Sequence, residues 1–232
     1  MIRKALVIVA ALAFSAAMVG TAGAAGVGVN GATASKDKLT TTAHPGTTRF
    51  IAPAPPPRKL KPIFDNIGFL YPKGLYFCCY GDTISGPTSP LAQTIWTATA
   101  FTPEKDSTVK LIEVAVGHVS GNNHIVLNIA KDDGGVPGNV VASAVATGLG
   151  EFGDCCVLAQ ANVRANLTGG TQYWVYLSTD DQSANTWMAW PFNSTDQSDT
   201  QDVAQYDGTS WTNFGPSRPE LSFALYGKIH ND

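Results

Sequence analysis

Apolar and polar residues alternate with a period of two along most of the chain after its first 93 residues, and clusters of Gly, Pro, Asn and Asp interrupt the alternation. This pattern is typical of short β-strands separated by turns. Ile112, Val114 and Val116 alternate with polar or small residues, which predicts a strand with one buried face. A second alternating run, Ile125 to Ile129, follows a Ser-Gly-Asn-Asn turn sequence, so the two runs predict a β-hairpin.

About nine strands are predicted in this way, and their short length and regular spacing favour an all-β fold, a two-layer antiparallel β-sandwich. A jelly-roll-like topology is the preferred arrangement. A closed barrel is the alternative, because the sequence alone does not determine how strands pair between sheets. The expected strands cover residues 95–101, 110–118, 125–129, 141–145, 156–163, 173–178, 186–192, 203–206, 211–214 and 221–227.

The N-terminus has the features of a cleavable secretory signal peptide. Arg3 and Lys4 precede an uncharged, mostly apolar run from Ala5 to Val19, and Ala24 completes a small-residue A-x-A pattern. We expect cleavage after Ala24, which makes residues 1–24 the signal peptide. An uncleaved membrane anchor is the alternative, but it would need about 20 apolar residues to cross the hydrocarbon core. The sequence therefore predicts a protein that is secreted, periplasmic or held at the cell envelope, with no transmembrane segment after cleavage.

The mature chain divides by composition. Residues 25–62 are rich in Pro, Thr and Ala with hardly any apolar periodicity, which predicts a disordered linker because such a segment cannot offset its chain entropy by burial. Residues 63–93 hold six aromatic side chains, too many for a free linker, and we expect this segment to pack on the sandwich. The predicted domain is therefore residues 63–232, with the aromatic segment at its N-terminal end.

Charge is distributed unevenly along the mature chain. Residues 25–90 carry seven Lys and Arg against three Asp, whereas residues 91–232 carry six against fifteen acidic residues. Nucleic-acid binding needs clustered basic side chains, so an acidic domain with scattered Lys and Arg indicates no nucleic-acid partner. The basic N-terminal part is interpreted as a solvated linker, with contact to an anionic envelope surface as the alternative.

The four cysteines form two adjacent pairs, Cys78 with Cys79 and Cys155 with Cys156. In an exported protein an even number of cysteines indicates disulfides, and four cysteines allow three connectivities. A bond within a pair is disfavoured, because neighbouring Cα atoms are about 3.8 Å apart and disulfides prefer about 4.4 to 6.8 Å. We therefore predict at least one bridge between the pairs. A zinc site is the alternative, although adjacent thiolates lack the usual ligand spacing.

Several sequences at expected turns and strand edges form a recognisable set: Ala100 to Pro103, Asp132 to Gly138, Leu167 to Trp174, Asp207 to Trp211 and Phe223 to Gly227. Together they resemble the β-sandwich of bacterial exported proteins called choice-of-anchor domains. The resemblance implies an extracellular or cell-envelope β-domain, and it implies no catalytic activity.

Neither a metal site nor a catalytic group is predicted. His118 continues the face of Val116, whereas His124 points to the other side of the next strand, so the two are not expected to share one ion. No G-x-S-x-G or H-E-x-x-H sequence occurs. The Asp pairs at 132–133 and 180–181 lie in turn-rich stretches, where Asp serves local backbone hydrogen bonds. Calcium remains an open alternative, because oxygen ligands gather in such loops even without an EF-hand pattern.

The aromatic-rich stretch around Trp187 and Trp190 gives the main functional hypothesis. These two rings face opposite sides of a strand, so one of them is expected to point outward unless a loop covers it. With Tyr206 and Trp211 they are candidate ligand-binding residues that stack on sugar rings, and core packing is the alternative for each ring. The prediction is a non-catalytic exported module that binds an extracellular or cell-envelope glycan or has a structural role at the surface. The competing class is a secreted polysaccharide hydrolase or lyase that uses loop carboxylates.

Overall fold

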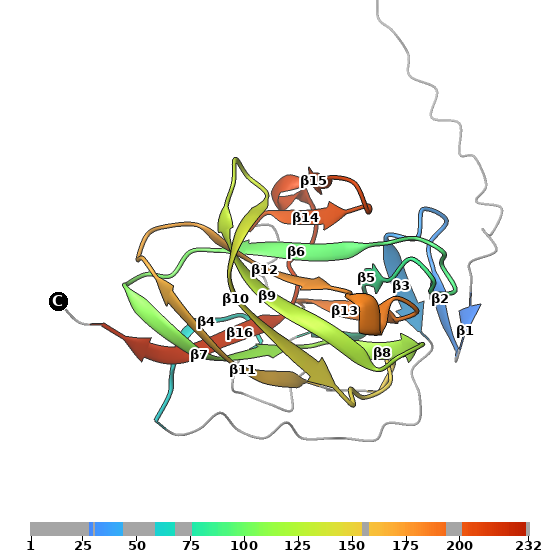
Figure 1. Cartoon of the computed structure of the whole chain (residues 1–232), viewed down its shortest axis with the longest axis horizontal. Helices are drawn as coiled ribbons and strands as arrows, with labels where there is room; N and C mark the ends of the chain where they lie inside the picture. Colours follow the sequence, from blue (N-terminus) through green and yellow to red (C-terminus); the bar gives the residue numbers. More distant parts are fainter. Residues whose placement is uncertain are drawn as a thin grey trace, which may run out of the picture.

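The computed structural model describes residues 28–29, 31–43, 59–67, 76–154, 158–193 and 201–230. Over these residues the chain forms sixteen strands and two short 3-10 helices, η1 (Asp181–Ser183) and η2 (Gly215–Ser217). All strand pairs within the sheets are antiparallel. The all-β antiparallel fold expected from the period-two alternation is confirmed (Figure 1).

Sheet I has six strands and forms one layer of the molecule. Its inner face buries alternate residues of the central strands, such as Leu127, Val175 and Leu177. In spatial order the strands are β10 (Pro137–Thr147), β9 (His124–Asp132), β12 (Tyr173–Ser178), β6 (Trp96–Phe101), β14 (Val203–Tyr206) and β15 (Trp211–Asn213).

Two further sheets lie opposite sheet I. Sheet II has four strands and sheet III has six. Sheet II consists of β11 (Ala159–Leu167), β7 (Ser107–Val114), β16 (Phe223–Ile229) and β4 (Lys61–Asp65). Sheet III consists of β1 (Gly28–Val29), β2 (Ala32–Ala34), β3 (Thr40–Ala43), β5 (Tyr76–Ser85), β13 (Trp187–Asn193) and β8 (Gly117–Ser120).

Sheets II and III join into a single second layer. Only Ala115 and Val116 separate β7 from β8, and the Ala115 amide donates to the Ser222 carbonyl oxygen at 3.1 Å. The Ser222 amide in turn donates to the Pro191 carbonyl oxygen at 3.1 Å. The architecture is therefore a two-layer sandwich with sixteen described strands instead of about nine. Part of the difference arises because the predicted strand 110–118 is split into β7 and β8 at this junction.

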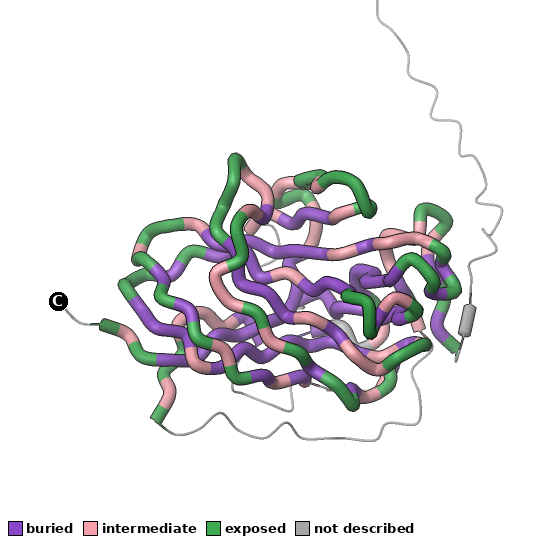
Figure 2. Tube along the Cα trace, in the orientation of Figure 1, coloured by how far each residue is buried: buried purple, intermediate pink, exposed green. Residues whose placement is uncertain are grey.

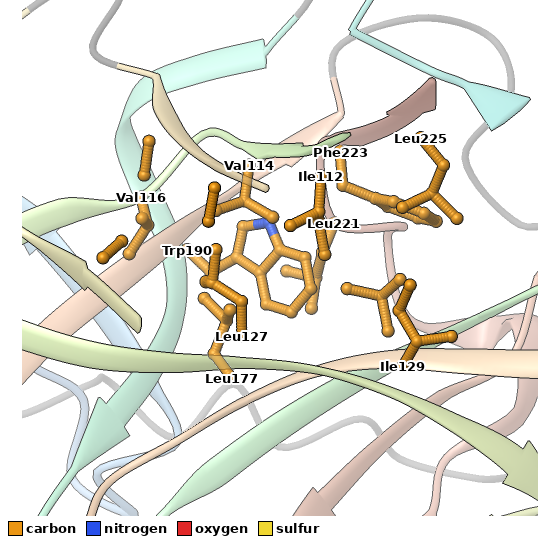
Figure 3. Packing of buried hydrophobic residues seen from close by; sticks show 14 of the residues in the cluster. Ile112, Val114, Val116, Leu127, Ile129, Leu177, Trp190, Leu221, Phe223 and Leu225 are labelled. Carbon is orange, nitrogen blue, oxygen red and sulfur yellow. The ribbon is translucent and has the colours of Figure 1, made fainter. Parts of the chain in front are cut away.

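The main hydrophobic core fills the space between the two layers. Trp190 of β13 lies at its centre, with Leu127 and Leu177 of sheet I on one side and Ile112 and Phe223 of sheet II on another (Figure 3). Figure 2 shows the buried positions running through the strands and the exposed positions at turns. The large number of buried aromatic and β-branched side chains supplies the main hydrophobic stabilisation of this fold.

The strand around Ile112 is buried on both faces, not on one as its alternation predicts. Glu113, on the outer face of sheet II, is only 4 % exposed. That face carries a second apolar cluster in which Leu111 and Tyr226 pack with Ile67 and other residues. The face of the strand that was expected to be polar and exposed is therefore covered. The Glu113 carboxyl group on this face accepts a hydrogen bond from the Gln160 side-chain amide.

The N-terminal part of the mature chain differs from the predicted disordered linker 25–62. Residues 31–43 form a hairpin, β2 and β3, and β3 pairs with β5 in sheet III. Lys61 and Pro62 belong to β4, the edge strand of sheet II. The hairpin forms without a large apolar residue in its strands because the threonines of β3 pair with β5 and because Ala32 and Ala34 pack in one cluster with Trp187 and Ala189.

Residues 44–58 lie outside the described part of the chain, as does the predicted signal peptide, residues 1–24. Within the aromatic segment 63–93, the Phe64 ring stacks on Phe223 with centroids 4.7 Å apart. No helix in the described ranges is long and apolar enough to span a bilayer.

Candidate functional site

The two tryptophans of β13 are buried, which corrects their assignment as ligand-binding residues. Trp187 and Trp190 face opposite sides of the sheet, as the alternation predicts, but both are 0 % exposed. Trp190 lies in the main core and donates from Nε1 to the Ser222 carbonyl oxygen at 2.9 Å. Trp187 lies on the outer face, where the N-terminal hairpin covers it and Thr41 Oγ1 accepts from its Nε1 at 3.1 Å. Neither ring is available for stacking on a ligand in this structure.

The other two predicted residues, Tyr206 and Trp211, belong to a half-buried group of rings on the outer face of sheet I. Tyr206 stacks on Trp96 with centroids 4.6 Å apart and lies 5.5 Å from Trp211. Trp211 makes an edge contact with Tyr176 at 5.4 Å. We call Trp96, Tyr176, Tyr206 and Trp211 the aromatic cluster.

Strand register explains why these four rings meet. Tyr206 is paired with Trp96 on one side and with Trp211 on the other, so three rings form one row across β6, β14 and β15. In the next row the small residues Ala98 and Ala204 separate β12 from β15, and both are fully buried. Because alanine side chains are short, Trp211 extends over them towards Tyr176 on β12.

Hydrogen bonds hold the β14–β15 hairpin that presents Trp211. The Asp207 carboxylate accepts from the Thr209 hydroxyl at 2.6 Å and from the Ser210 and Thr209 amides at 2.9 and 2.8 Å, and these bonds lower the pKa of Asp207 to about 2. At the other end of the hairpin, Asn213 Nδ2 donates to the Gly135 carbonyl oxygen at 2.6 Å. The turn and the strand end are thus both fixed, which orders the rings before any ligand arrives.

Polar groups lie next to the aromatic cluster. Trp96 Nε1 donates to Thr179 Oγ1 at 3.1 Å. Asn128, paired with Tyr176, donates to Ser178 Oγ at 2.9 Å and accepts from Ser143 Oγ at 2.9 Å. Burial raises the pKa of the Tyr176 hydroxyl, so that group stays protonated and can both donate and accept. The face therefore combines apolar ring surface with hydroxyl and amide groups.

The carboxylates considered for catalysis are used to hold turns. Asp132 accepts from the Gly135 amide, from Gln172 Nε2 at 3.0 Å and from Trp174 Nε1 at 2.8 Å. Asp180 caps η1 by accepting from the amides at its first turn and also pairs with His124 Nε2 at 3.0 Å. The bonds to the Gly135 amide and to the amides of η1 are the local backbone bonds expected of Asp132 and Asp180, whereas those to Gln172, Trp174 and His124 join distant segments.

His118 and His124 have separate partners. His118 Nε2 lies 3.0 Å from the Gly121 carbonyl oxygen and its Nδ1 lies 3.4 Å from Glu151, whereas His124 pairs with Asp180. In the part of the chain that the structure describes, no group of three or more His, Cys, Asp and Glu side chains is close enough to hold a metal ion.

Only one of the four cysteine side chains in the predicted disulfides, that of Cys79, lies within the described residues. Cys79 of β5 lies with its Sγ 3.9 Å from the carbonyl oxygen of Gly153, two residues before Cys155. Cys155, Cys156 and the side chain of Cys78 lie outside the described residues. A bridge between the two cysteine pairs therefore stays a prediction.

Sequence reasoning missed Trp96 and Tyr176. Both positions could have been found from the period of two, since Trp96 shares a face with Ala98 and Ala100, and Tyr176 lies between the core residues Val175 and Leu177. Sequence reasoning instead chose the strand of Trp187 and Trp190, because two tryptophans lie close together there, and both are buried.

No family model matches this chain, and no curated protein matches its sequence. The fold and the site define the class: an all-β antiparallel protein with a half-buried aromatic cluster on one sheet. The resemblance to choice-of-anchor domains stays a hypothesis.

Proposed function

We propose that this chain is an exported, non-catalytic β-sandwich module that binds a glycan of the cell envelope or the extracellular space. The observation that carries the proposal is the aromatic cluster, in which Tyr206 and Trp211 lie with Trp96 and Tyr176 on one sheet face. Tyr and Trp present an apolar ring and a polar tip, a combination that suits sugar rings with their apolar faces and hydroxyl edges.

The packing of the four rings against one another supports binding. A ring that is already ordered loses little conformational entropy when a ligand stacks on it, so more of the contact energy appears as affinity. Thr179 and Ser178 are buried beside Trp96 and Tyr176 and bond to Trp96 and Asn128, so they help to fix the rings, and the Tyr176 hydroxyl is the group that we expect to bond a sugar hydroxyl.

The alternative function, a polysaccharide hydrolase or lyase, has less support. Such chemistry needs two carboxyl groups that face each other across the substrate. Asp132 and Asp180 are engaged in fixing turns and neighbouring side chains, and this use does not leave them as the acid and base of one site.

Export is part of the same proposal. It rests on the N-terminal sequence Arg3 to Ala24 and on the even number of cysteines, both of which are typical of proteins that fold outside the cytoplasm. Glycans of the envelope or of the surroundings are the partners available in that location.

A glycan array with the chain from residue 25 to residue 232 tests the proposal. Trp211→Ala is the matched variant, and Tyr80→Ala is the control, because Tyr80 is an aromatic residue 45 % exposed on a different sheet. We expect defined glycans to bind the wild type and the control, with a weaker signal in Trp211→Ala. An array on which the wild type binds nothing, or on which Trp211→Ala binds unchanged, contradicts the proposal.

A further inference from the structure

Asp82 is a fully buried carboxyl group within the sandwich. It belongs to β5, where it is paired with Trp190 of β13 and with Thr40 of β3. Its exposed fraction is 0 %. An ionised carboxylate in such a position is unfavourable unless its oxygens are paired and hydrogen-bonded.

The pairing of Asp82 is incomplete. Arg218, which follows η2, donates from Nε to Oδ1 of Asp82 at 3.1 Å, and its Nη2 also donates to Oδ1. Both Arg218 donors therefore bond to the same carboxyl oxygen, and neither bonds to the other oxygen. The other oxygen, Oδ2, is buried and has no hydrogen-bond partner among the residues that the structure describes. Half of the carboxyl group is thus desolvated without compensation.

The same arginine also bonds to the N-terminal hairpin. Arg218 Nη2 donates to the Leu39 carbonyl oxygen at 3.4 Å, and Gln205 Nε2 donates to the same oxygen at 3.2 Å. The Thr83 amide is a third donor to it at 2.9 Å. Leu39 precedes β3, so the carbonyl that fixes the hairpin lies beside the buried carboxyl group.

Polar contacts form much of the attachment of the hairpin. Thr41 Oγ1 lies 2.9 Å from Thr83 Oγ1 and accepts from Trp187 Nε1. The apolar part of the contact on the hairpin side comes from Ala32 and Ala34, both small residues. Because the buried apolar area is small, the free energy that holds the hairpin is sensitive to the electrostatic state of its neighbours.

The charged groups that act on Asp82 are Arg218 and Asp37. Burial raises the pKa of Asp82 to about 7, Arg218 opposes this rise through its charge and hydrogen bonds, and Asp37 in the turn of the hairpin adds to it. The folded protein therefore favours the protonated carboxyl group. The stabilisation is present at acidic pH and is lost as pH rises through about 7.

We propose that the N-terminal hairpin, residues 31–43, is a pH-controlled edge of sheet III, docked on β5 when Asp82 is protonated and loosened when Asp82 is ionised. Ionisation leaves a buried charge beside Leu39 that Arg218 pairs at Oδ1 alone, and separation of the hairpin hydrates it. Loosening uncovers Trp187 and the apolar residues around it, Leu91, Val119 and Phe152. The covered face is opposite to the main core, so the sandwich remains closed.

Hydrogen exchange measured by mass spectrometry on the chain from residue 25 to residue 232 tests this proposal at pH 6 and pH 8.5. Exchange rates are corrected for the intrinsic effect of pH, and peptides from β9 serve as the internal reference. We expect the protection factors of peptides from residues 31–43 to fall at least tenfold at the higher pH, relative to those of β9. Asp82→Asn, which removes the charge at similar shape, is expected to show no such loss.

Three results would overturn the proposal. The first is equal protection of the hairpin at both pH values, and the second is weaker protection at acidic pH, which would mean that the ion pair is net stabilising. The third is the same pH-dependent loss in Asp82→Asn. The first two results come from the wild type alone, by comparison of the hairpin with β9. The proposal can therefore fail even if Asp82→Asn does not fold.

Discussion

Trp190 fills the space between the two layers, whereas Trp211 lies on a surface, so their substitutions are expected to differ. Trp190→Ala removes a ring that is 0 % exposed and one of the two donors to the Ser222 carbonyl oxygen, the other being the Ala115 amide. We expect a loss of about 3–5 kcal/mol in the free energy of unfolding, which corresponds to a fall in Tm on the order of 10 °C. Trp211→Ala is the comparison, with a smaller expected fall. Similar melting temperatures for the two variants would contradict the placement of these rings.

Asp82 gives the protein a stability that depends on pH. Its pKa is about 7 in the folded state against an ordinary value of 3.8, so the folded state binds more protons than the unfolded state between these values. The free energy of unfolding is therefore expected to fall as pH rises from about 4 to about 7. Urea unfolding at pH 5 and pH 8 measures this, and Asp82→Asn is expected to reduce the difference. A wild type that is more stable at pH 8 than at pH 5 contradicts the assignment.

Single residues show how far reasoning from the sequence reaches. Tyr206 and Trp211 were candidates for an exposed platform, with core packing as the alternative, and they lie half-buried in the aromatic cluster. One of Trp187 and Trp190 was expected to point outward unless a loop covered it, and the cover of Trp187 includes Thr41, which is 146 positions away in the sequence. Local alternation gives the side on which a ring lies, but it does not give what covers that side.

Among the elements, β7, β9 and β12 follow directly from alternating apolar residues, and their existence was predicted. The N-terminal hairpin was not predicted, because neither of its strands contains a large apolar side chain and its strand character depends on pairing with β5. Thr40 pairs with Asp82 across 42 positions, and no local signal marks such a partner. The threonines of β3 are β-branched residues that favour strands, which is the one cue that the composition of this segment offered.

Deletion of residues 25–43 tests the role of the hairpin as an element. Without β2 and β3 the indole of Trp187 loses its cover and the bond to Thr41, so we expect a red shift of tryptophan fluorescence and a lower Tm. Far-UV circular dichroism should retain the β-sheet signal, because the main core does not include the hairpin. Unchanged fluorescence and Tm would show that the hairpin does not pack on Trp187.

At the scale of the whole molecule, one covalent link is predicted between distant segments. Cys79 lies on β5 near the Gly153 carbonyl oxygen, and Cys155 and Cys156 follow closely in the sequence. We expect peptide mapping without reduction to find at least one bridge from Cys78 or Cys79 to Cys155 or Cys156. Bridges found only between adjacent cysteines would contradict this prediction, since such bonds require a strained backbone.

The whole molecule also combines two surfaces that the sandwich keeps apart. The outer face of sheet I carries the aromatic cluster, and the outer face of sheet III carries the hairpin over Trp187. Gln205 of β14 bonds to the Leu39 carbonyl oxygen, but its side chain leaves the strand on the face opposite to Tyr206, so changes at Asp82 are expected to leave the aromatic cluster in place. Glycan binding and pH response are therefore separable properties in this account.

The central claim is that the aromatic cluster binds a glycan, and equilibrium titration of the strongest glycan from the array tests it most directly. Wild type, Trp211→Ala and Tyr80→Ala are compared under the same conditions. Stacking on one ring contributes about 0.5–1.5 kcal/mol, so the account predicts that Trp211→Ala raises Kd up to about tenfold while Tyr80→Ala leaves it unchanged. Equal Kd values for wild type and Trp211→Ala, with both proteins folded, would contradict the claim.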